Sequence, residues 1–107
     1  MTVAVLIREQ FGDECEIDVD IDPKKNEIFL LLGGTATFIG QWPDLDVVIM
    51  KAMNGKDLNK NTLPSPFDTE EVKGPILLIR MDDESNPQDF TLQEYITFAR
   101  GNKRITV

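Results

Sequence analysis

Apolar and polar residues alternate in several stretches of the chain, and the period of each alternation indicates its secondary structure. Residues 3–9 are mainly aliphatic, and residues 15–22 alternate strictly between apolar and acidic side chains. Because successive side chains of a strand point to opposite faces, this second stretch predicts a strand with one apolar face and one almost wholly anionic face. The two runs, separated by Phe11-Gly12-Asp13, therefore predict two consecutive strands.

A helix is expected between Asp22 and the Gly33-Gly34 pair. Asp22 is placed to act as the N-cap, Pro23 to occupy the first helical position, and the glycines to end the helix. Three apolar residues between them have the spacing of a core-facing stripe: Ile28, Leu31 and Leu32. Residues 28–32 taken alone are equally typical of a buried strand.

Three further strands are predicted downstream. Residues 35–41 and 46–53 are rich in β-branched and aromatic residues and flank a turn containing Pro43, which predicts a hairpin. Asn54-Gly55 is a strong turn signal because both residues tolerate positive φ. The polar residues up to position 73 predict a long ordered loop, with or without a short strand. Residues 75–81 are apolar almost throughout, as expected of a central strand buried on both faces.

The C-terminal helix has the clearest start signal. Thr91 and Glu94 have the spacing of a capping box, and Phe90 and Tyr95 stand where a hydrophobic staple packs. The buried stripe is expected at Leu92, Tyr95, Ile96 and Ala99. Gly101 is the expected C-cap. The order β-β-α-β-β-β-α, in a single domain of residues 1–107, predicts an α+β fold with a mainly antiparallel sheet of about five strands and both helices on one face.

Composition and charge narrow the function classes. The 107 residues contain 11 Lys and Arg against 19 Asp and Glu, a net charge of −8, which disfavours nucleic acid and anionic membranes as partners. The absence of histidine excludes imidazole bases, histidine-activated nucleophiles and histidine-ligated metals. The single cysteine excludes an internal disulfide, and no apolar run is long enough for a signal peptide or a bilayer span. We therefore expect a cytoplasmic or nuclear protein.

No segment has the spacing of a metal or phosphate site. Asp18, Asp20 and Asp22 resemble the start of a calcium loop, but Pro23 and Phe29 occupy the positions of its glycine and its last carboxylate. Gly33-Gly34-Thr35 follows the predicted helix, whereas a phosphate-binding glycine loop precedes one. The predictions are therefore no metal and no cofactor.

No residue has the surroundings of a catalytic group either. Cys15 belongs to the apolar side of its strand, where a thiol is normally inert. Paired carboxylates are abundant, but abundance in an acidic chain does not indicate an acid and base pair. We therefore predict a protein that is not an enzyme.

The middle of the chain carries the candidate binding residues. A single Trp beside a proline turn and a run of loop amides supply stacking and hydrogen bonding. The predicted binding residues are Gln41, Trp42, Asp46, Asn54, Lys56, Asn59 and Asn61. The alternative is that Trp42 closes one end of the core and that the asparagines only take up turn conformations.

Several motifs follow one another in the order found in a group of small uncharacterised proteins. They are LLGGTATFI at 31–39, VVI at 47–49, NGK at 54–56, NTLP at 61–64, KGPILLI at 73–79 and FTL at 90–92. In these motifs the chain resembles proteins of phages and mobile elements, and similar proteins of algae and their large DNA viruses. It departs from them in having Asn59 and Asn61 before Leu63-Pro64, where that group has an Asn after the proline. The resemblance implies an α+β fold and a viral or virus-like context.

These observations favour a small accessory protein that binds a partner protein through the surface between Trp42 and Asn61. The alternative is a protein that binds or sequesters a nucleotide-like signal, with Trp42 stacking on a base and Lys51, Lys56, Lys60 and Asn61 contacting phosphates. A third class, an enzyme that uses carboxylates and a divalent ion, would need a metal. An unpaired outer strand would also allow a symmetric homodimer.

Overall fold

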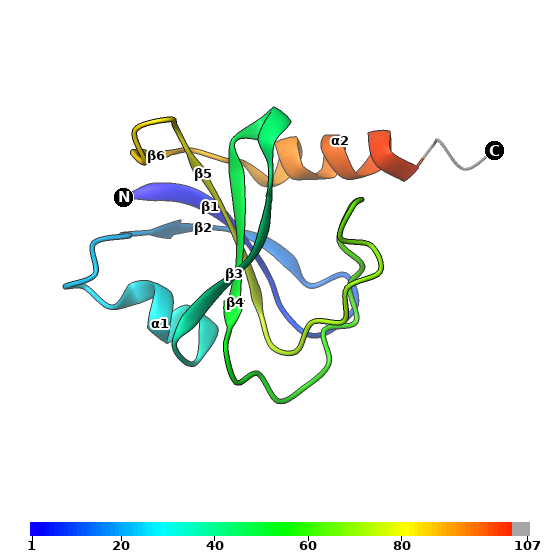
Figure 1. Cartoon of the computed structure of the whole chain (residues 1–107), viewed down its shortest axis with the longest axis horizontal. Coiled ribbons are helices and arrows are strands. Elements are labelled where there is room, and N and C mark those ends of the chain that lie inside the picture. The colour runs from blue at the N-terminus through cyan, green and yellow to red at the C-terminus, as the bar shows by residue number, and fades with distance from the viewer. Residues whose placement is uncertain (104–107) are drawn as a thin grey trace.

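The protein is an α+β domain built on one antiparallel sheet, which confirms the predicted fold class. The computed structural model describes residues 1–103, the last two by backbone only. The strands are β1 (Thr2–Ile7), β2 (Glu14–Val19), β3 (Ala36–Trp42), β4 (Val47–Ala52), β5 (Ile76–Met81) and β6 (Pro87–Gln88). The helices are α1 (Glu27–Leu32), the 3-10 turn η1 (Pro43–Leu45) and α2 (Leu92–Lys103). The strands lie in the order β2-β1-β5-β4-β3, and the short β6, which was not predicted, pairs with β5 (Figure 1).

β5 is the central strand, as its sequence predicts. It pairs with β1 on one side and with β4 on the other, and Ile76–Ile79 are 0% exposed. Ile76 and Leu78 belong to one core cluster, and Leu77 and Ile79 belong to the other. The two clusters therefore lie on opposite faces of the sheet.

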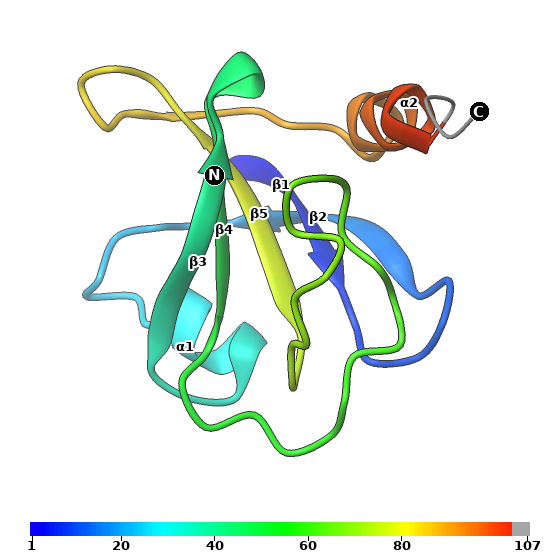
Figure 2. The same cartoon turned by 45° about the vertical axis from the view of Figure 1, so that its right-hand side comes forward.

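The two helices cover opposite faces, so the prediction that both lie on one face is wrong. Leu92 and Phe98 of α2 pack against the cluster that contains Leu78, whereas Leu31 and Leu32 of α1 pack against the cluster that contains Leu77. Figures 1 and 2 show α1 and α2 on either side of the strands. The physical reason is that a strand buried on both faces needs cover on both sides of the sheet.

The helix α1 begins later than predicted. Asp22 accepts hydrogen bonds from Lys24 through its side chain (3.0 Å) and from Lys25 through its C=O (2.9 Å), so it closes a turn instead of capping the helix. The residue before α1 is Asn26, at φ 61° and without a side-chain capping bond. The predicted end is confirmed: Gly33 has φ 76° and its N–H donates to Phe29 O at 2.9 Å.

The capping box of α2 is confirmed, but its predicted C-cap is wrong. Glu94 N donates to Thr91 Oγ1 and Thr91 N donates to Glu94 Oε1, both at 3.1 Å. Leu92 N donates to Glu16 Oε1 at 3.0 Å, so one carboxylate of the acidic strand face satisfies a second N-terminal donor of the helix. Gly101 lies inside the helix, which continues to Lys103.

The outer strands β2 and β3 differ in their side chains. β2 carries Glu14, Glu16 and Asp18, whereas β3 (ATFIGQW) carries no charged residue. β3 has a register shift between Phe38 and Gly40 in its pairing with β4. Within residues 1–103, no backbone hydrogen bond joins the free side of β3 to another segment.

Candidate functional site

Trp42, the main predicted binding residue, lies in the core. Its side chain is 3% exposed, and its Nε1 donates to Ser65 O at 3.2 Å. The indole contacts the rings of Phe67, Tyr95 and Phe98, with centroids 6.1, 6.3 and 5.1 Å away. The prediction of an accessible indole is wrong, because aromatic residues from two distant segments enclose it. The nucleotide hypothesis therefore has no Trp on which a base could stack.

Asn59 and Asn61 hold the loop between β4 and β5 against the turn between β1 and β2. Asn59 is 7% exposed, and its Oδ1 accepts from the N–H of Asn61 at 3.0 Å. The two side chains bond to five further backbone groups: Ile7 O (3.2 Å) and Gly74 O (3.0 Å) for Asn59, and Arg8 O (2.8 Å), Gln10 O (2.9 Å) and Gly12 N (2.8 Å) for Asn61. These amides are occupied by the protein's own backbone, so the structure gives them a structural role.

Asn54 and Lys56 are exposed in the loop that follows β4. The chain turns at Met53 and Asn54, but neither Asn54 nor Gly55 has a positive φ, so this turn does not use the conformation expected of the Asn-Gly pair. Gly55 is required for another reason: a Cβ atom there would lie 2.1 Å from the backbone O of Lys73. Asp46 and Asn54 lie at opposite ends of β4, so the predicted binding residues do not form one surface.

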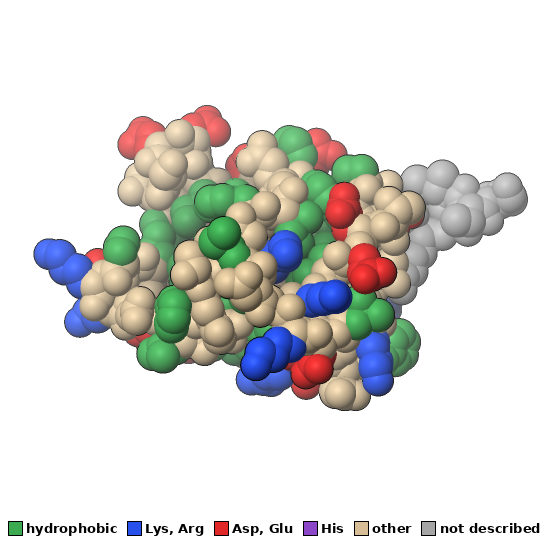
Figure 3. Space-filling model, turned by 60° about the horizontal axis from the view of Figure 1, so that its bottom comes forward, with side chains coloured by type: hydrophobic (Ala, Val, Ile, Leu, Met, Phe, Trp, Pro, Cys, Tyr) green, Lys and Arg blue, Asp and Glu red, His purple; other side chains and the backbone are tan. Residues whose placement is uncertain are grey.

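Gln41 and Asp46 do come together, in a hollow of about 510 Å³. The hollow lies between the β3–β4 hairpin and the turn that joins β5 to β6. Its floor is apolar, with the partly buried Val48 and Met81 and with Phe38 as a wall, and its remaining lining residues are Pro43 and the polar Gln41, Asp46, Asp82, Asp83 and Ser85. Figure 3 shows two protrusions with acidic side chains at the upper edge of the view and apolar side chains between and below them.

The hollow is open because α1 is too short to cover its face of the sheet. The helix has six residues and contacts β3 and β4 near Ala36 and Met50. Beyond this contact Phe38 is 65% exposed, although it pairs with the buried Met50. On α1 itself Phe29 is 44% and Leu30 is 71% exposed. We call the apolar residues on the β3 side of this face, Phe29, Phe38, Val48 and Met81, the α1-side patch, whereas Leu30 lies beside Asp18 of β2.

One carboxylate at the rim, that of Asp82, is held in place by the local backbone. The N–H of Asn86 (2.8 Å) and that of Glu84 (2.9 Å) both donate to Asp82 Oδ1. The hydrogen bond from Asn86 is the main cause that lowers the pKa of Asp82 below its ordinary value of 3.8. Asp46 has φ 56°, and its C=O accepts from Met81 N at 2.8 Å, which joins η1 to β5. Asp82 is therefore a fixed negative charge at neutral pH.

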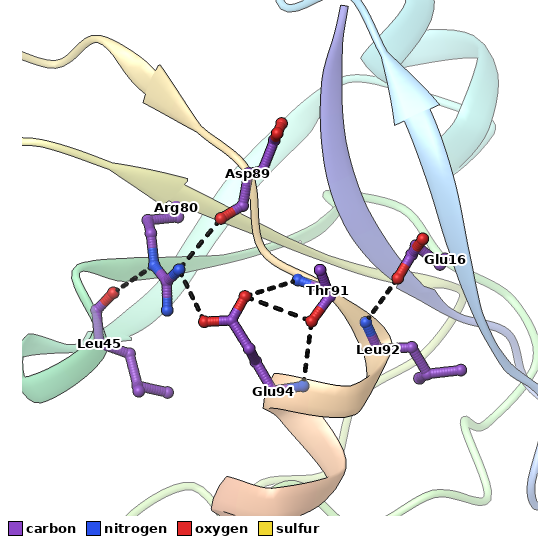
Figure 4. Close-up of polar contacts among 7 residues, drawn as sticks. All are labelled: Glu16, Leu45, Arg80, Asp89, Thr91, Leu92 and Glu94. Carbon is purple, nitrogen blue, oxygen red and sulfur yellow. Dashed lines mark hydrogen bonds and ion pairs between the residues drawn. The ribbon is translucent and has the colours of Figure 1, made fainter.

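The nearest cation along β5 points to the other face of the sheet. Arg80 donates to Leu45 O (2.9 Å) and Asp89 O (3.0 Å), pairs with Glu94 (2.9 Å) and lies 5.0 Å from the ring centroid of Phe90 (Figure 4). Its charge is thus used to fix the start of α2. Lys and Arg are absent from the residues that line the hollow.

A second hollow, of about 540 Å³, lies between α2 and residues 62–68. Its lining is chemically mixed and includes Glu14, Ser65, Tyr95 and Arg100. Burial raises the pKa of Tyr95 well above its ordinary value of 10.0, and the charge of Glu14 adds to this effect, so the phenol stays protonated. Among the residues that the structure describes, no three His, Cys, Asp or Glu side chains are grouped to hold a metal ion.

A family model matches residues 5–98. The chain belongs to this family, the Family of unknown function (DUF5880). No curated protein and no solved structure matches the chain. The DUF5880 match runs from β1 into α2 and includes the whole α1-side patch. None of the helices within residues 1–103 is long and apolar enough to cross a membrane.

The residues of the α1-side patch are absent from the predicted binding set. One signal for them lies in residues 27–32 (EIFLLL), which are apolar on every side of a helix after the first position. A helix that is apolar all round is normally buried all round, and the chain offers α1 only one face of a sheet. Phe38 has no such signal, because its exposure depends on where α1 ends.

Proposed function

We propose that this member of the DUF5880 family is a non-enzymatic binding module that docks a partner protein on the α1-side patch. The observation that supports it is the exposure of Phe38 (65%) on the sheet face that α1 leaves open, with Phe29 (44%) exposed on α1 beside the same face. Contiguous exposed apolar side chains rimmed by polar groups are typical of protein interaction surfaces. Phe is also enriched at such interfaces.

Burial of these side chains in an interface contributes favourable free energy of binding. Moving one fully exposed Phe or Leu side chain from water into an apolar interface contributes about 1.5–3 kcal/mol. A partner that covers Phe38 and Phe29 therefore gains several kcal/mol, which offsets part of the cost of association. The hollow beside Tyr95 has a similar volume, but none of its lining residues is a large apolar side chain as exposed as Phe38.

The resemblance to proteins of phages and of algal viruses adds a biological context to this proposal. A small acidic protein with one docking surface suits a viral or virus-like accessory factor that binds a host protein. Such a partner would be met in the cytoplasm or nucleus, in keeping with a chain that has one cysteine and thus no internal disulfide.

The test compares two Phe→Asp variants in partner capture. Phe38→Asp places a charge in the patch, whereas Phe11→Asp changes an 84% exposed Phe in the turn between β1 and β2. We expect wild type and Phe11→Asp to retain a common protein from cell extract, and Phe38→Asp to lose it. Phe38→Ala, which adds no charge, should weaken retention by about 10-fold or more, as loss of over 1.4 kcal/mol implies.

The captured protein is then purified and its footprint mapped by hydrogen exchange. Docking on the α1-side patch slows exchange in α1, β3 and β4 and leaves α2 unchanged. A footprint on α2 or on residues 54–62, or equal capture by Phe38→Asp and wild type, would contradict the proposal. The fluorescence of the buried Trp42 reports whether each variant is folded.

A further inference from the structure

We propose that the docking segment of the partner is basic and that one of its Lys or Arg side chains enters the hollow beside Asp46 and Asp83. This inference rests on the proposed docking function and names the chemistry of its partner. It is carried by two independent features of the same hollow, which are an apolar floor and an unneutralised acidic rim.

The rim has negative charge without a compensating cation. Asp46, Asp82 and Asp83 all line the hollow, and none of the residues around it is Lys or Arg. Neither of the ion pairs found among the described residues involves these three aspartates. Arg80 is held on the opposite face by Glu94 at 2.9 Å. A cation brought by a partner therefore meets three carboxylates that no described Lys or Arg neutralises, although Asp82 also accepts hydrogen bonds from Glu84, Asn86 and Gln88.

The floor suits the stem of the same cation. Val48 and Met81 are partly buried at the base of the hollow, and Phe38 forms the wall toward β3. Lys and Arg carry a chain of methylene groups that packs on apolar surface while the charged head stays at a polar rim. The volume of about 510 Å³ admits one such side chain together with its hydration. An anionic or purely apolar segment would match only one half of this lining.

The rest of the patch favours a protein segment over a small amine. The exposed ring of Phe38 lines the hollow, and the exposed ring of Phe29 lies beyond it, on α1. From Val48 to Ala52 the strand β4 rises about 13 Å, at roughly 3.3 Å per residue. A segment that covers this length has its basic residue at the hollow and an apolar residue about four positions away, at the Ala52 end of β4, where Phe29 lies near Ala36, the strand partner of Ala52.

A second copy of the chain is a poor occupant of the same surface. In a symmetric dimer the same patch meets itself, so acidic rim would approach acidic rim. Each copy also carries a net charge of −8, which adds long-range repulsion. Charge complementarity therefore selects a basic partner.

The test is selection of a random peptide library displayed on phage against the wild-type protein. We expect the peptides retained to contain more Lys and Arg than Asp and Glu, with an apolar residue about four positions from a basic one. Their synthetic forms should bind wild type and Phe11→Asp, and should lose binding to Phe38→Asp.

The charge contribution is measured with a double variant, Asp46→Asn with Asp83→Asn. Asn is tolerated at the positive φ of position 46, so the backbone is preserved. We expect affinity for the selected peptides to fall by about 3- to 10-fold at low salt, and by less at high salt, as for exposed ion pairs. The matched control, Asp57→Asn with Asp68→Asn, changes the net charge equally at two exposed positions outside the hollow and should bind like wild type.

The possible failures separate the two proposals. Peptides that depend on Phe38 but show no basic preference, or that bind equally to the Asp46 and Asp83 double variant, overturn the basic segment and leave the docking surface intact. Selection that yields only peptides indifferent to Phe38→Asp overturns the docking surface itself, and the inference with it.

Discussion

Replacing Asn59 by Ala separates the structural role of this residue from the binding role that its sequence context predicts. The side chain is 7% exposed and donates to Ile7 O at 3.2 Å and to Gly74 O at 3.0 Å. Its Oδ1 also accepts from Asn61 N at 3.0 Å and from Asn61 Nδ2 at 3.1 Å. The substitution removes all of these hydrogen bonds and leaves two carbonyl groups without this donor.

The expected loss follows from typical hydrogen-bond contributions. Each bond contributes about 1 kcal/mol net, and a buried group left without a partner costs about 1–3 kcal/mol. Since water reaches part of the loop in the variant, we expect the free energy of unfolding to fall by about 3 kcal/mol. A domain of this size is stable by roughly 5–15 kcal/mol, so the variant still folds at 25 °C. Its melting temperature should fall by roughly 12 °C or more.

The assay is urea unfolding followed by the fluorescence of Trp42, which is enclosed in the folded state. Asn54→Ala is the matched control, because Asn54 is exposed and such a change costs less than about 0.5 kcal/mol. A free energy of unfolding of Asn59→Ala within about 0.5 kcal/mol of that of Asn54→Ala is what a neutral surface change gives. The hydrogen bonds of the Asn59 side chain would then contribute nothing to stability. The structural role of Asn59 and Asn61 would then be refuted.

Three further predictions concern single positions. Burial acts to raise the pKa of Glu94, but hydrogen bonds from Thr91 and Arg80 outweigh it and hold the pKa below 4.5. A carboxyl group whose pKa is lower in the folded state stabilises the protein at any pH above its unfolded pKa. This stabilisation is lost as the pH falls through the folded pKa. The stability difference between wild type and Glu94→Gln, measured by urea unfolding, should therefore shrink below pH 4.5, and a pH-independent difference would contradict this. Gly55→Ala would place a Cβ 2.1 Å from a backbone oxygen, whereas Gly34→Ala would place one 3.9 Å from its nearest neighbour, Ala52 Cβ. Gly55→Ala should therefore lower the melting temperature clearly more than Gly34→Ala, and equal shifts would disprove the close approach. Gly101→Ala should stabilise the protein by up to about 1 kcal/mol in thermal unfolding, because Gly101 lies inside α2. If Gly101 were needed as a C-cap, the same substitution would destabilise the protein.

The parts of the fold that are predictable from sequence carry local signals. The apolar run of β5 and the capping box of α2 each determine an element within a few residues, and both are confirmed. The start of α1 is less determined, because Asp22-Pro23 suits a turn as well as a helix N-terminus. The face on which each helix packs depends on contacts between distant segments, which no local period encodes.

The candidate site is harder to predict, for a related reason. Trp42 has the same sequence surroundings whether it is exposed or enclosed, and its enclosure comes from Phe67, Tyr95 and Phe98. Asn59 and Asn61 look like recognition residues because amides are versatile donors and acceptors, but their partners include backbone groups of Ile7 and Arg8, more than fifty residues earlier in the chain. Gln41 and Asp46 were predicted, and they share the hollow; their binding role stays a prediction.

The contrast between the two outer strands has a consequence for handling the isolated protein. The carboxylates of β2 oppose addition of another strand on that side, whereas β3 has no charge to oppose it and exposes Phe38. Solubility without a partner then depends on mutual repulsion of whole molecules. This repulsion vanishes near the isoelectric point of about 4.4, so concentrated samples should precipitate first at that acidity.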